Sequence, residues 1–283
     1  TRVNAQGLVE NVQILSSNLV QNGDFSEEGA EEVSNGSFSQ EGVQLVTNGD
    51  FATDTAWAKG TGWSISGGTA NCDGTQTSGT NLIQNGLALG TNKIFKIEFE
   101  LKDYQAGELI YVNLTGTGIL EFENINANGT YVAYSGLSTG DNFITFRADA
   151  DFIGSIDNVS VREVGQDWGA AGVIDANNTV SFANNELTLR NDGSSSGVRQ
   201  DSLTSGKTYK VVVNVTDIVG NGFKVDMGNF QDITTTGTKT FYLTATTASL
   251  YLYRNLTSPQ AVNGATITNI SVKEVGQNWT LGA

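Results

Sequence analysis

The sequence contains no histidine, a single cysteine and a single proline among its 283 residues. Without an imidazole there can be no Ser-His-Asp or Cys-His nucleophile, and no zinc, iron or copper site ligated by histidine. One cysteine also excludes a disulfide framework and a thiolate zinc cage. An enzyme built from this chain would have to work with carboxylates, Tyr, Lys or Ser alone.

Basic residues are scarce as well, because 15 Lys and Arg stand against 30 Asp and Glu, which gives a formal net charge of −15. Nucleic acids and anionic membranes attract clustered Lys and Arg, so we expect neither as a partner. No apolar run approaches the roughly 18 residues of a membrane-spanning helix, so we expect no membrane insertion. The start at Thr1 has no initiator Met and no signal segment, and it indicates a piece of a longer product.

A short repeat fills the N-terminal part of the chain. The sequence Asn-Gly-Asp/Ser-Phe occurs at residues 22–25, 35–38 and 48–51, a spacing of 13 residues. Each unit has too few apolar residues to bury a core alone, so it needs support from its neighbours, from the next domain or from other chains. We interpret residues 1–43 as a repeat-containing stalk, with a flexible acidic linker as the alternative.

A second repeat has the size of a domain. Residues 154–168 return as residues 265–279, and both stretches contain Glu-Val-Gly-Gln, then one further residue and then Trp. This predicts two tandem domains, 44–165 and 166–275, followed at 276–283 by the start of a further repeat or a C-terminal tail. The second copy lacks the Asn-Gly-Asp-Phe opening of the first.

Within each copy the hydrophobic period is two. Over Phe95–Leu101, for example, apolar residues alternate with charged ones, as in a strand with one face in a core and the other in water. Short β-branched and aromatic runs recur at about 8–12-residue spacing with Gly, Asn and Asp between them. The pattern predicts an all-β fold: tandem antiparallel jelly-roll β-sandwiches preceded by a short N-terminal stalk.

Three segments carry a resemblance to a known class of domain. Gln44–Phe51, Gly62–Ile65 and Ile156–Val161 resemble a carbohydrate-binding-module jelly roll from its first strand to its last. The resemblance covers residues 44–165 and, more loosely, residues 166–275. It implies non-catalytic glycan recognition through aromatic platforms and, in many members, a structural calcium ion near the first and last strands.

A second resemblance concerns the N-terminus. Arg2–Glu10, followed by the Asn-Gly-Asp-Phe copies, is similar to tail-fibre and other virion surface proteins of tailed bacteriophages. In such particles, modules of this kind are appendages that decorate the virion or touch the host surface.

Aromatic residues are the candidate sugar ligands. In Ser249–Tyr253 the period of two places Leu250 and Leu252 on one face and Tyr251 and Tyr253 on the other. If the leucines face the core, the tyrosines form a sugar platform; cross-strand aromatic pairing that only stabilises the sheet is the alternative. Trp63 is a further candidate for stacking on a pyranose, with structural packing as its alternative.

Asp50 and Asp157 match the opening and closing motifs of the resemblance, so they are the candidate calcium ligands. The alternatives are a turn-stabilising role for Asp50 and an ordinary exposed strand position for Asp157. Paired carboxylates can hydrolyse glycosides without histidine, but Glu98 and Glu100 lie along an ordinary solvated strand face. We therefore expect no enzymatic activity.

These observations predict a non-enzymatic appendage or fibre protein on the exterior of a virion, displaying carbohydrate-binding-like modules for adhesion or decoration. Its expected partners are other virion proteins, further copies of itself, for example as a trimer, and a cell-surface glycan. One alternative is a secreted bacterial carbohydrate-binding protein or the accessory modules of a polysaccharide-degrading enzyme. Another is a purely structural cement or filament subunit.

Overall fold

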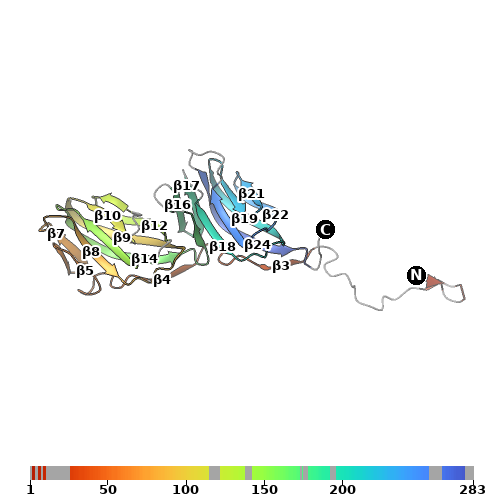
Figure 1. Ribbon diagram of the computed structural model, residues 1–283, viewed down its shortest axis with the longest axis horizontal. Helices are drawn as coiled ribbons and strands as arrows, with labels where there is room; N and C mark the ends of the chain where they lie inside the picture. The colour runs from red at the N-terminus through yellow and green to blue at the C-terminus, as the bar shows by residue number, and fades with distance from the viewer. Residues whose placement is uncertain are drawn as a thin grey trace.

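The computed structural model describes residues 2–3, 6–7, 9–10, 26–114, 122–137, 142–172, 174, 178–191, 196–254 and 263–277. These residues form two antiparallel β-sandwiches placed end to end, together with a small hairpin of β1 (Arg2–Val3) and β2 (Val9–Glu10) (Figure 1). The predicted all-β class and the tandem sandwiches are confirmed. Among the described residues, no helix has the length and apolar character needed to cross a membrane.

The first sandwich packs two sheets against each other. One has the order β11-β10-β13-β8-β5, formed by β5 (Ala58–Lys59), β8 (Thr80–Asn85), β10 (Leu109–Asn113), β11 (Phe122–Ile125) and β13 (Phe143–Ala148). The other has the order β12-β9-β14-β7-β6, formed by β6 (Trp63–Ser66), β7 (Thr69–Asp73), β9 (Lys93–Ala106), β12 (Gly129–Leu137) and β14 (Ile153–Val164).

The second sandwich repeats this plan. One sheet has the order β15-β18-β23-β20-β21, formed by β15 (Gly169–Ala171), β18 (Gly197–Asp201), β20 (Phe223–Asp226), β21 (Phe230–Ile233) and β23 (Ser249–Arg254). The other has the order β16-β17-β24-β19-β22, formed by β16 (Asn178–Ala183), β17 (Glu186–Asn191), β19 (Thr208–Val219), β22 (Gly237–Thr244) and β24 (Asn263–Val275).

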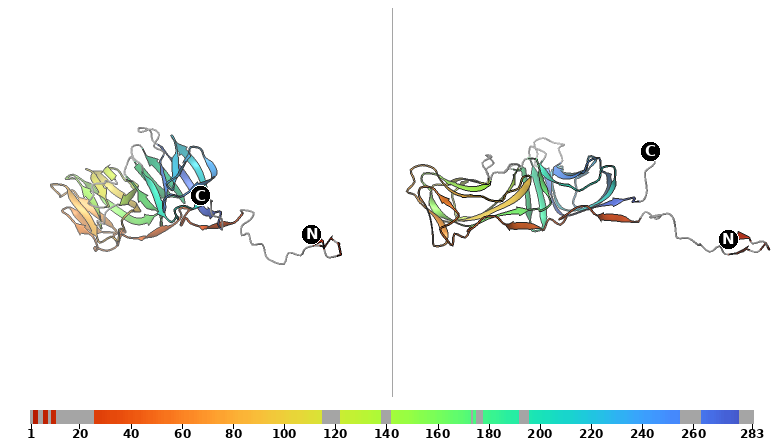
Figure 2. Two further views of the ribbon diagram at one scale, coloured as in Figure 1. Left: turned by 45° about the vertical axis from the view of Figure 1, so that its right-hand side comes forward. Right: turned by 60° about the horizontal axis from the view of Figure 1, so that its bottom comes forward.

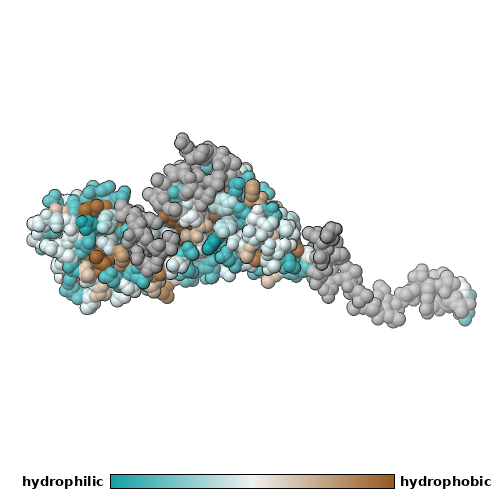
Figure 3. Space-filling view, in the orientation of Figure 1, coloured by the Kyte–Doolittle hydropathy of each residue, from teal (hydrophilic) through white to brown (hydrophobic). Residues whose placement is uncertain are grey.

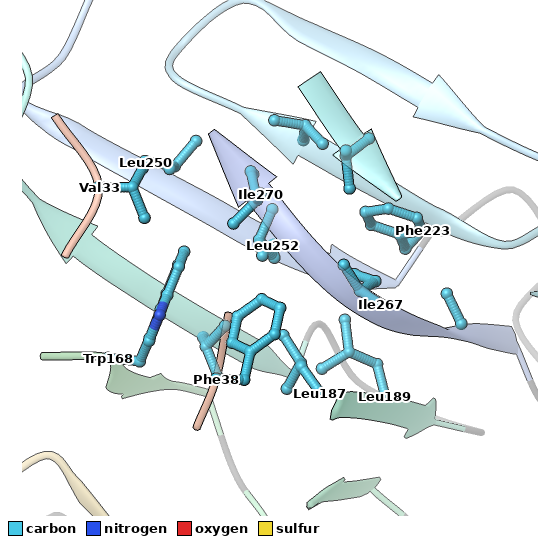
Figure 4. Close-up of a cluster of buried hydrophobic side chains, with 14 of the residues drawn as sticks. Val33, Phe38, Trp168, Leu187, Leu189, Phe223, Leu250, Leu252, Ile267 and Ile270 are labelled. Atoms are coloured by element: carbon cyan, nitrogen blue, oxygen red, sulfur yellow. The ribbon is translucent and has the colours of Figure 1, made fainter. Parts of the chain in front are cut away.

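The period-two pattern explains where the cores lie. Phe95, Ile97 and Phe99 of β9 are at most 1% exposed, while the lysine and the glutamate between them, Lys96 and Glu98, face outward. Tyr209 and Val211 of β19 are buried in the same way in the second sandwich. Figure 4 shows part of the second core, where side chains from both sheets and from the N-terminal segment meet. In the orientation of Figure 3, the described surface is mostly hydrophilic, with apolar colour confined to small patches.

The N-terminal segment is built into the sandwiches. Strand β3 (Glu28–Glu31) pairs with β24, and β4 (Glu41–Gln44) pairs with β14 (Figure 2). On one edge, the long strands β24 and β14 are paired with their own sandwich over only part of their length. β17 pairs only with residues 263–267 of β24, and β7 pairs only with residues 153–156 of β14. The added strands cover these open edges. Within the predicted stalk, β3 and β4 are thus supported by pairing with the two sandwiches.

Each of the two described Asn-Gly segments, 35–38 and 48–51, plugs the core of one sandwich. Val46 and Phe51 lie in the first core, and the Phe51 ring packs 5.2 Å from the Trp57 ring. The Trp57 indole donates to the carbonyl of Asn48 at 3.0 Å. The amide of Val159 on β14 donates to the carbonyl of Gly49 at 2.9 Å.

The preceding copy makes the same contacts with the other sandwich. Phe38 packs 5.6 Å from Trp168, whose indole donates to the Asn35 carbonyl at 3.1 Å. The amide of Ile270 on β24 donates to the carbonyl of Gly36 at 2.9 Å. Residues 166–275 lack an Asn-Gly opening motif of their own. Residues 35–38, which precede the first sandwich in the sequence, supply it. The first copy, residues 22–25, and the predicted tail from residue 278 onward lie outside the described residues.

The two sandwiches touch directly. The amide of Ala170 donates to the Asn92 carbonyl at 2.9 Å, and the Tyr134 hydroxyl donates to the Phe182 carbonyl at 3.2 Å. Ile94 and Val164 of the first sandwich belong to the buried cluster of the second. This junction places a loop of the first sandwich beside one sheet face of the second.

Candidate functional site

The candidate binding surface is the outer face of the sheet β15-β18-β23-β20-β21 in the second sandwich. On β23, Leu250 and Leu252 are completely buried, whereas Tyr251 and Tyr253 are partly exposed on the opposite face. The predicted division of this strand is therefore confirmed. The two tyrosine rings lie with centroids 6.2 Å apart and planes at 77°.

Strand register adds polar groups to this face. Arg199 on β18 and Asp226 on β20 are the cross-strand partners of Tyr251. Gly197 stands opposite Tyr253, and a Cβ at Gly197 would come within 2.8 Å of the Cβ of Tyr253. This glycine therefore keeps one side of the Tyr253 side chain uncovered.

Hydrogen bonds hold both tyrosines in place. The Tyr253 hydroxyl donates to the Asp226 carboxylate, and the Arg199 side chain is hydrogen-bonded to Tyr251, which raises the pKa of Arg199. Burial, and then the bond to Asp226, raise the pKa of Tyr253 well above its usual value of 10.0. The phenol is consequently a neutral donor, and neither ring is free to swing away from the face.

A third aromatic ring extends the face on the far side of β20. Phe230 on β21 is the cross-strand partner of Asp226 and is 53% exposed. The Lys224 ammonium lies 3.9 Å from the centre of the Phe230 ring and 3.6 Å from the Asp232 carboxylate. The face thus carries three accessible aromatic rings, interleaved with side chains that can donate or accept hydrogen bonds.

A groove runs beside the tyrosines at the junction of the sandwiches. Its volume is about 420 Å³, and its lining comes from both sandwiches: Asn92, Ala170, Ala171, Gly172, Arg199, Tyr251 and Tyr253. A second hollow of about 200 Å³ shares Asn92 and Arg199 with it. Arg199 therefore stands where the two hollows meet.

The first sandwich does not repeat this arrangement. When the two sandwiches are compared by their strand pairing, β13 of the first corresponds to β23 of the second. Thr145 and Arg147 of β13 then take the positions of Tyr251 and Tyr253. The Arg147 guanidinium donates to the Asn81 carboxamide at 3.2 Å, across the position that Gly197 leaves open. The aromatic platform is therefore a property of the second sandwich.

Trp63 is not a surface ligand, which corrects its prediction as a sugar-stacking residue. It is 7% exposed and packs against Phe152, with ring centroids 6.0 Å apart. Strand β6 alternates strictly, so Trp63 and Ile65 both face the core. Its indole Nε1 is buried and has no hydrogen-bond partner in the described part of the chain.

The two predicted calcium ligands are engaged in local contacts. The Asp157 carboxylate accepts from the Lys102 ammonium at 2.8 Å, and Lys102 also pairs with Glu100 at 3.1 Å. Asp50 accepts from the amide of Ala52 at 3.3 Å, in a turn of its own. Within the described ranges no group of three or more Asp, Glu, Cys or His could hold a metal ion. The calcium site at Asp50 and Asp157 stays a prediction.

Sequence reasoning identified the two tyrosines but missed Arg199, Lys224, Asp226 and Phe230. Arg199, Lys224 and Asp226 occupy outward positions in strands whose alternate residues are buried, which the sequence pattern can indicate. Phe230 has no such signal, because its neighbour Gln231 is exposed as well. The order β18-β23-β20 cannot be predicted from the sequence pattern, because long stretches of sequence separate these three strands, whereas β20 and β21 are neighbours in the sequence.

No protein-family profile and no curated protein matches this sequence. Among solved structures, the chain is similar to the N-terminal CBM22-1–CBM22-2 tandem domain of Paenibacillus barcinonensis Xyn10C, with 12% identity and a TM-score of 0.35 over 84% of this chain and 99% of that one. It is also similar to allantoicase of Saccharomyces cerevisiae, with 11% identity and a TM-score of 0.25 over 70% and 77% of the two chains. The likeness is distant at these scores.

Proposed function

We propose that the second sandwich is a non-enzymatic carbohydrate-recognition module that binds its ligand on the face formed by Tyr251, Tyr253 and Phe230. The observation that carries this proposal is the fixed pair of partly exposed tyrosines beside a groove of about 420 Å³. Aromatic rings stack on the apolar face of a pyranose, while nearby polar side chains bind its hydroxyl groups.

The polar groups of the face favour a neutral polysaccharide. Arg199 supplies guanidinium donors beside Tyr251, and Asp226 supplies carboxylate oxygens beside Tyr253. Cationic and anionic side chains alternate here, so no single sign of charge selects an ionic ligand. The groove is open along the junction and suits a segment of a sugar chain better than one enclosed sugar ring.

The wider setting follows the sequence-based prediction. We propose that such modules serve adhesion or decoration as part of an appendage on a virion exterior, with a secreted bacterial carbohydrate-binding protein as the alternative. We assign no catalytic role to this face, because its central carboxylate, Asp226, already accepts a hydrogen bond from the Tyr253 hydroxyl. The genes that flank this one test the setting: capsid and tail genes support the virion, and secreted hydrolases support the alternative.

The binding proposal is tested by affinity electrophoresis of the whole chain in a panel of soluble neutral polysaccharides. Tyr251→Ala is expected to weaken binding tenfold or more, about 1.4 kcal/mol. The matched control is Tyr242→Ala, which removes a 60% exposed tyrosine from β22 on the other sheet of the same sandwich. Equal retention of binding by both variants, or no binding by the unaltered chain, would contradict the proposal.

A further inference from the structure

The binding face of the second sandwich ends at the first sandwich. Cross-strand pairing aligns one row of residues across the sheet: Phe230, Asp226, Tyr251, Arg199 and Gly169. Gly169 lies on β15, the edge strand of this sheet, so the row stops there. Asn92 of the first sandwich lies next to this edge, because a Cβ on Gly169 would come within 3.3 Å of the Asn92 carbonyl oxygen.

Strand β15 leaves the path between the tyrosines and the first sandwich open. Its outward positions are Gly169 and Ala171, which pair with Arg199 and Gly197 of β18. Neither residue has a side chain larger than a methyl group. The groove of about 420 Å³ and the hollow of about 200 Å³ are therefore both lined by Arg199 on one side and by Asn92 on the other.

The junction fixes the backbone of Asn92. Its φ is 57°, in the left-handed region, and its carbonyl accepts from the Ala170 amide of the second sandwich at 2.9 Å. The next residue, Lys93, begins β9 and pairs with Glu163 at 2.7 Å. The turn that presents Asn92 is thus held from both sandwiches, and so is the wall of the groove that it forms.

The second sandwich shows what the backbone alone requires at this position. The register of β9 with β14 and of β19 with β24 makes Gly206 the counterpart of Asn92. Gly206 also has a positive φ, of 88°. Glycine adopts such an angle without steric cost, so the turn itself needs no side chain. The asparagine of the first sandwich adds a carboxamide that only its surroundings can use, and these surroundings include the groove.

We infer that Asn92 is a ligand-binding residue and that the glycan site is composite, with one wall from each sandwich. This inference rests on the proposed function of the tyrosine face. A sugar chain that fills the groove meets aromatic rings on the side of Tyr251 and Tyr253 and a carboxamide on the side of Asn92. A carboxamide both donates and accepts hydrogen bonds, which suits the hydroxyl groups of a neutral sugar.

A ligand that contacts both walls also stabilises the junction between the sandwiches. Binding to the closed junction, and not to an opened one, shifts the equilibrium toward the closed form. The hydrogen bond from the Ala170 amide to the Asn92 carbonyl spans this junction. Bound polysaccharide is therefore expected to slow hydrogen exchange of the Ala170 amide and of the turn at residues 91–93.

The first test is affinity electrophoresis of the full chain in hydroxyethylcellulose, galactomannan and dextran. Asn92→Gly keeps the left-handed backbone, removes the carboxamide and is expected to weaken binding roughly three- to tenfold. Asn185→Gly is the matched control, because it makes the same change at an exposed turn residue with a φ of 61°. Equal retardation of these two variants would overturn the composite site, while Tyr251→Ala still decides the proposed function. If none of the three polysaccharides retards the unaltered chain, both proposals fail.

The second test needs no variant and separates binding by Asn92 from an effect on folding. Amide hydrogen exchange of the unaltered chain is compared with and without the polysaccharide that retards it most. Slower exchange at residues 91–93 and at Ala170, together with residues 249–253, supports the composite site. Slower exchange at residues 249–253 alone would overturn it and leave the tyrosine face as the complete site.

Discussion

Replacing Gly36 by alanine is expected to unfold the sandwich that is more distant in sequence and to spare the nearer one. Gly36 precedes the first sandwich, yet its carbonyl accepts from the Ile270 amide of the second sandwich at 2.9 Å. A Cβ at Gly36 would lie 2.2 Å from the Ile270 carbonyl oxygen, so the segment has to retreat by roughly 1 Å. That movement breaks the hydrogen bond and withdraws Phe38 from Trp168.

The magnitude follows from these two losses. Forcing an extra methyl group into a packed core costs about 1–3 kcal/mol, and the lost hydrogen bond adds about 0.5–1.5 kcal/mol. A total of roughly 2–4 kcal/mol lowers the melting temperature of a sandwich of this size by roughly 10–20 °C.

The assay is amide hydrogen exchange on the full chain, read by mass spectrometry as the temperature rises. Gly36→Ala is expected to remove protection from β19 and β24 at lower temperature while β9 and β14 stay protected. Gly49→Ala is the mirror experiment, because its Cβ would lie 2.1 Å from the Val159 carbonyl oxygen in the first sandwich. Ser37→Ala, at an exposed position, is the neutral control. Loss of protection in the first sandwich from Gly36→Ala would refute the reasoning.

Three further predictions concern the first sandwich. Trp63→Ala is expected to cost about 3–5 kcal/mol in urea unfolding, since the ring is 7% exposed, and to leave polysaccharide binding unchanged; a loss of binding without a loss of stability would contradict the core assignment. Burial raises the pKa of Cys72 from 9.0 to about 11, so the neutral thiol adds stability below pH 9 that is lost as the pH rises through 11. Urea unfolding should therefore show a decline over this window that is shallower in Cys72→Ala by roughly 2–3 kcal/mol, and equal declines would contradict it. EDTA is expected to leave the melting temperature unchanged, because Asp157 is already paired with Lys102 at 2.8 Å, and a drop reversed by calcium would instead support the predicted calcium site.

The sequence by itself determined the fold class and the division of individual strands. Period-two alternation was sufficient to place Leu250 and Leu252 inside and Tyr251 and Tyr253 outside, because neighbouring side chains of a strand point to opposite faces. The return of residues 154–168 at 265–279 was sufficient to show two modules of one kind.

Only the tertiary structure decided what depends on pairing between distant strands. Trp63 has the residue type of a sugar ligand, but it occupies an inward-facing position of β6 and is therefore buried. Arg199 and Asp226 join the tyrosines only through the register of β18, β20 and β23, which are far apart in sequence. Phe230 then lies beside Asp226 through the pairing of β20 with β21. The segment at 35–38 closes the second sandwich although the first sandwich is nearer in sequence, and the segment at 48–51 closes the first. Local sequence specifies a strand and its faces, whereas the choice of partner is set by long-range contacts that no short window contains.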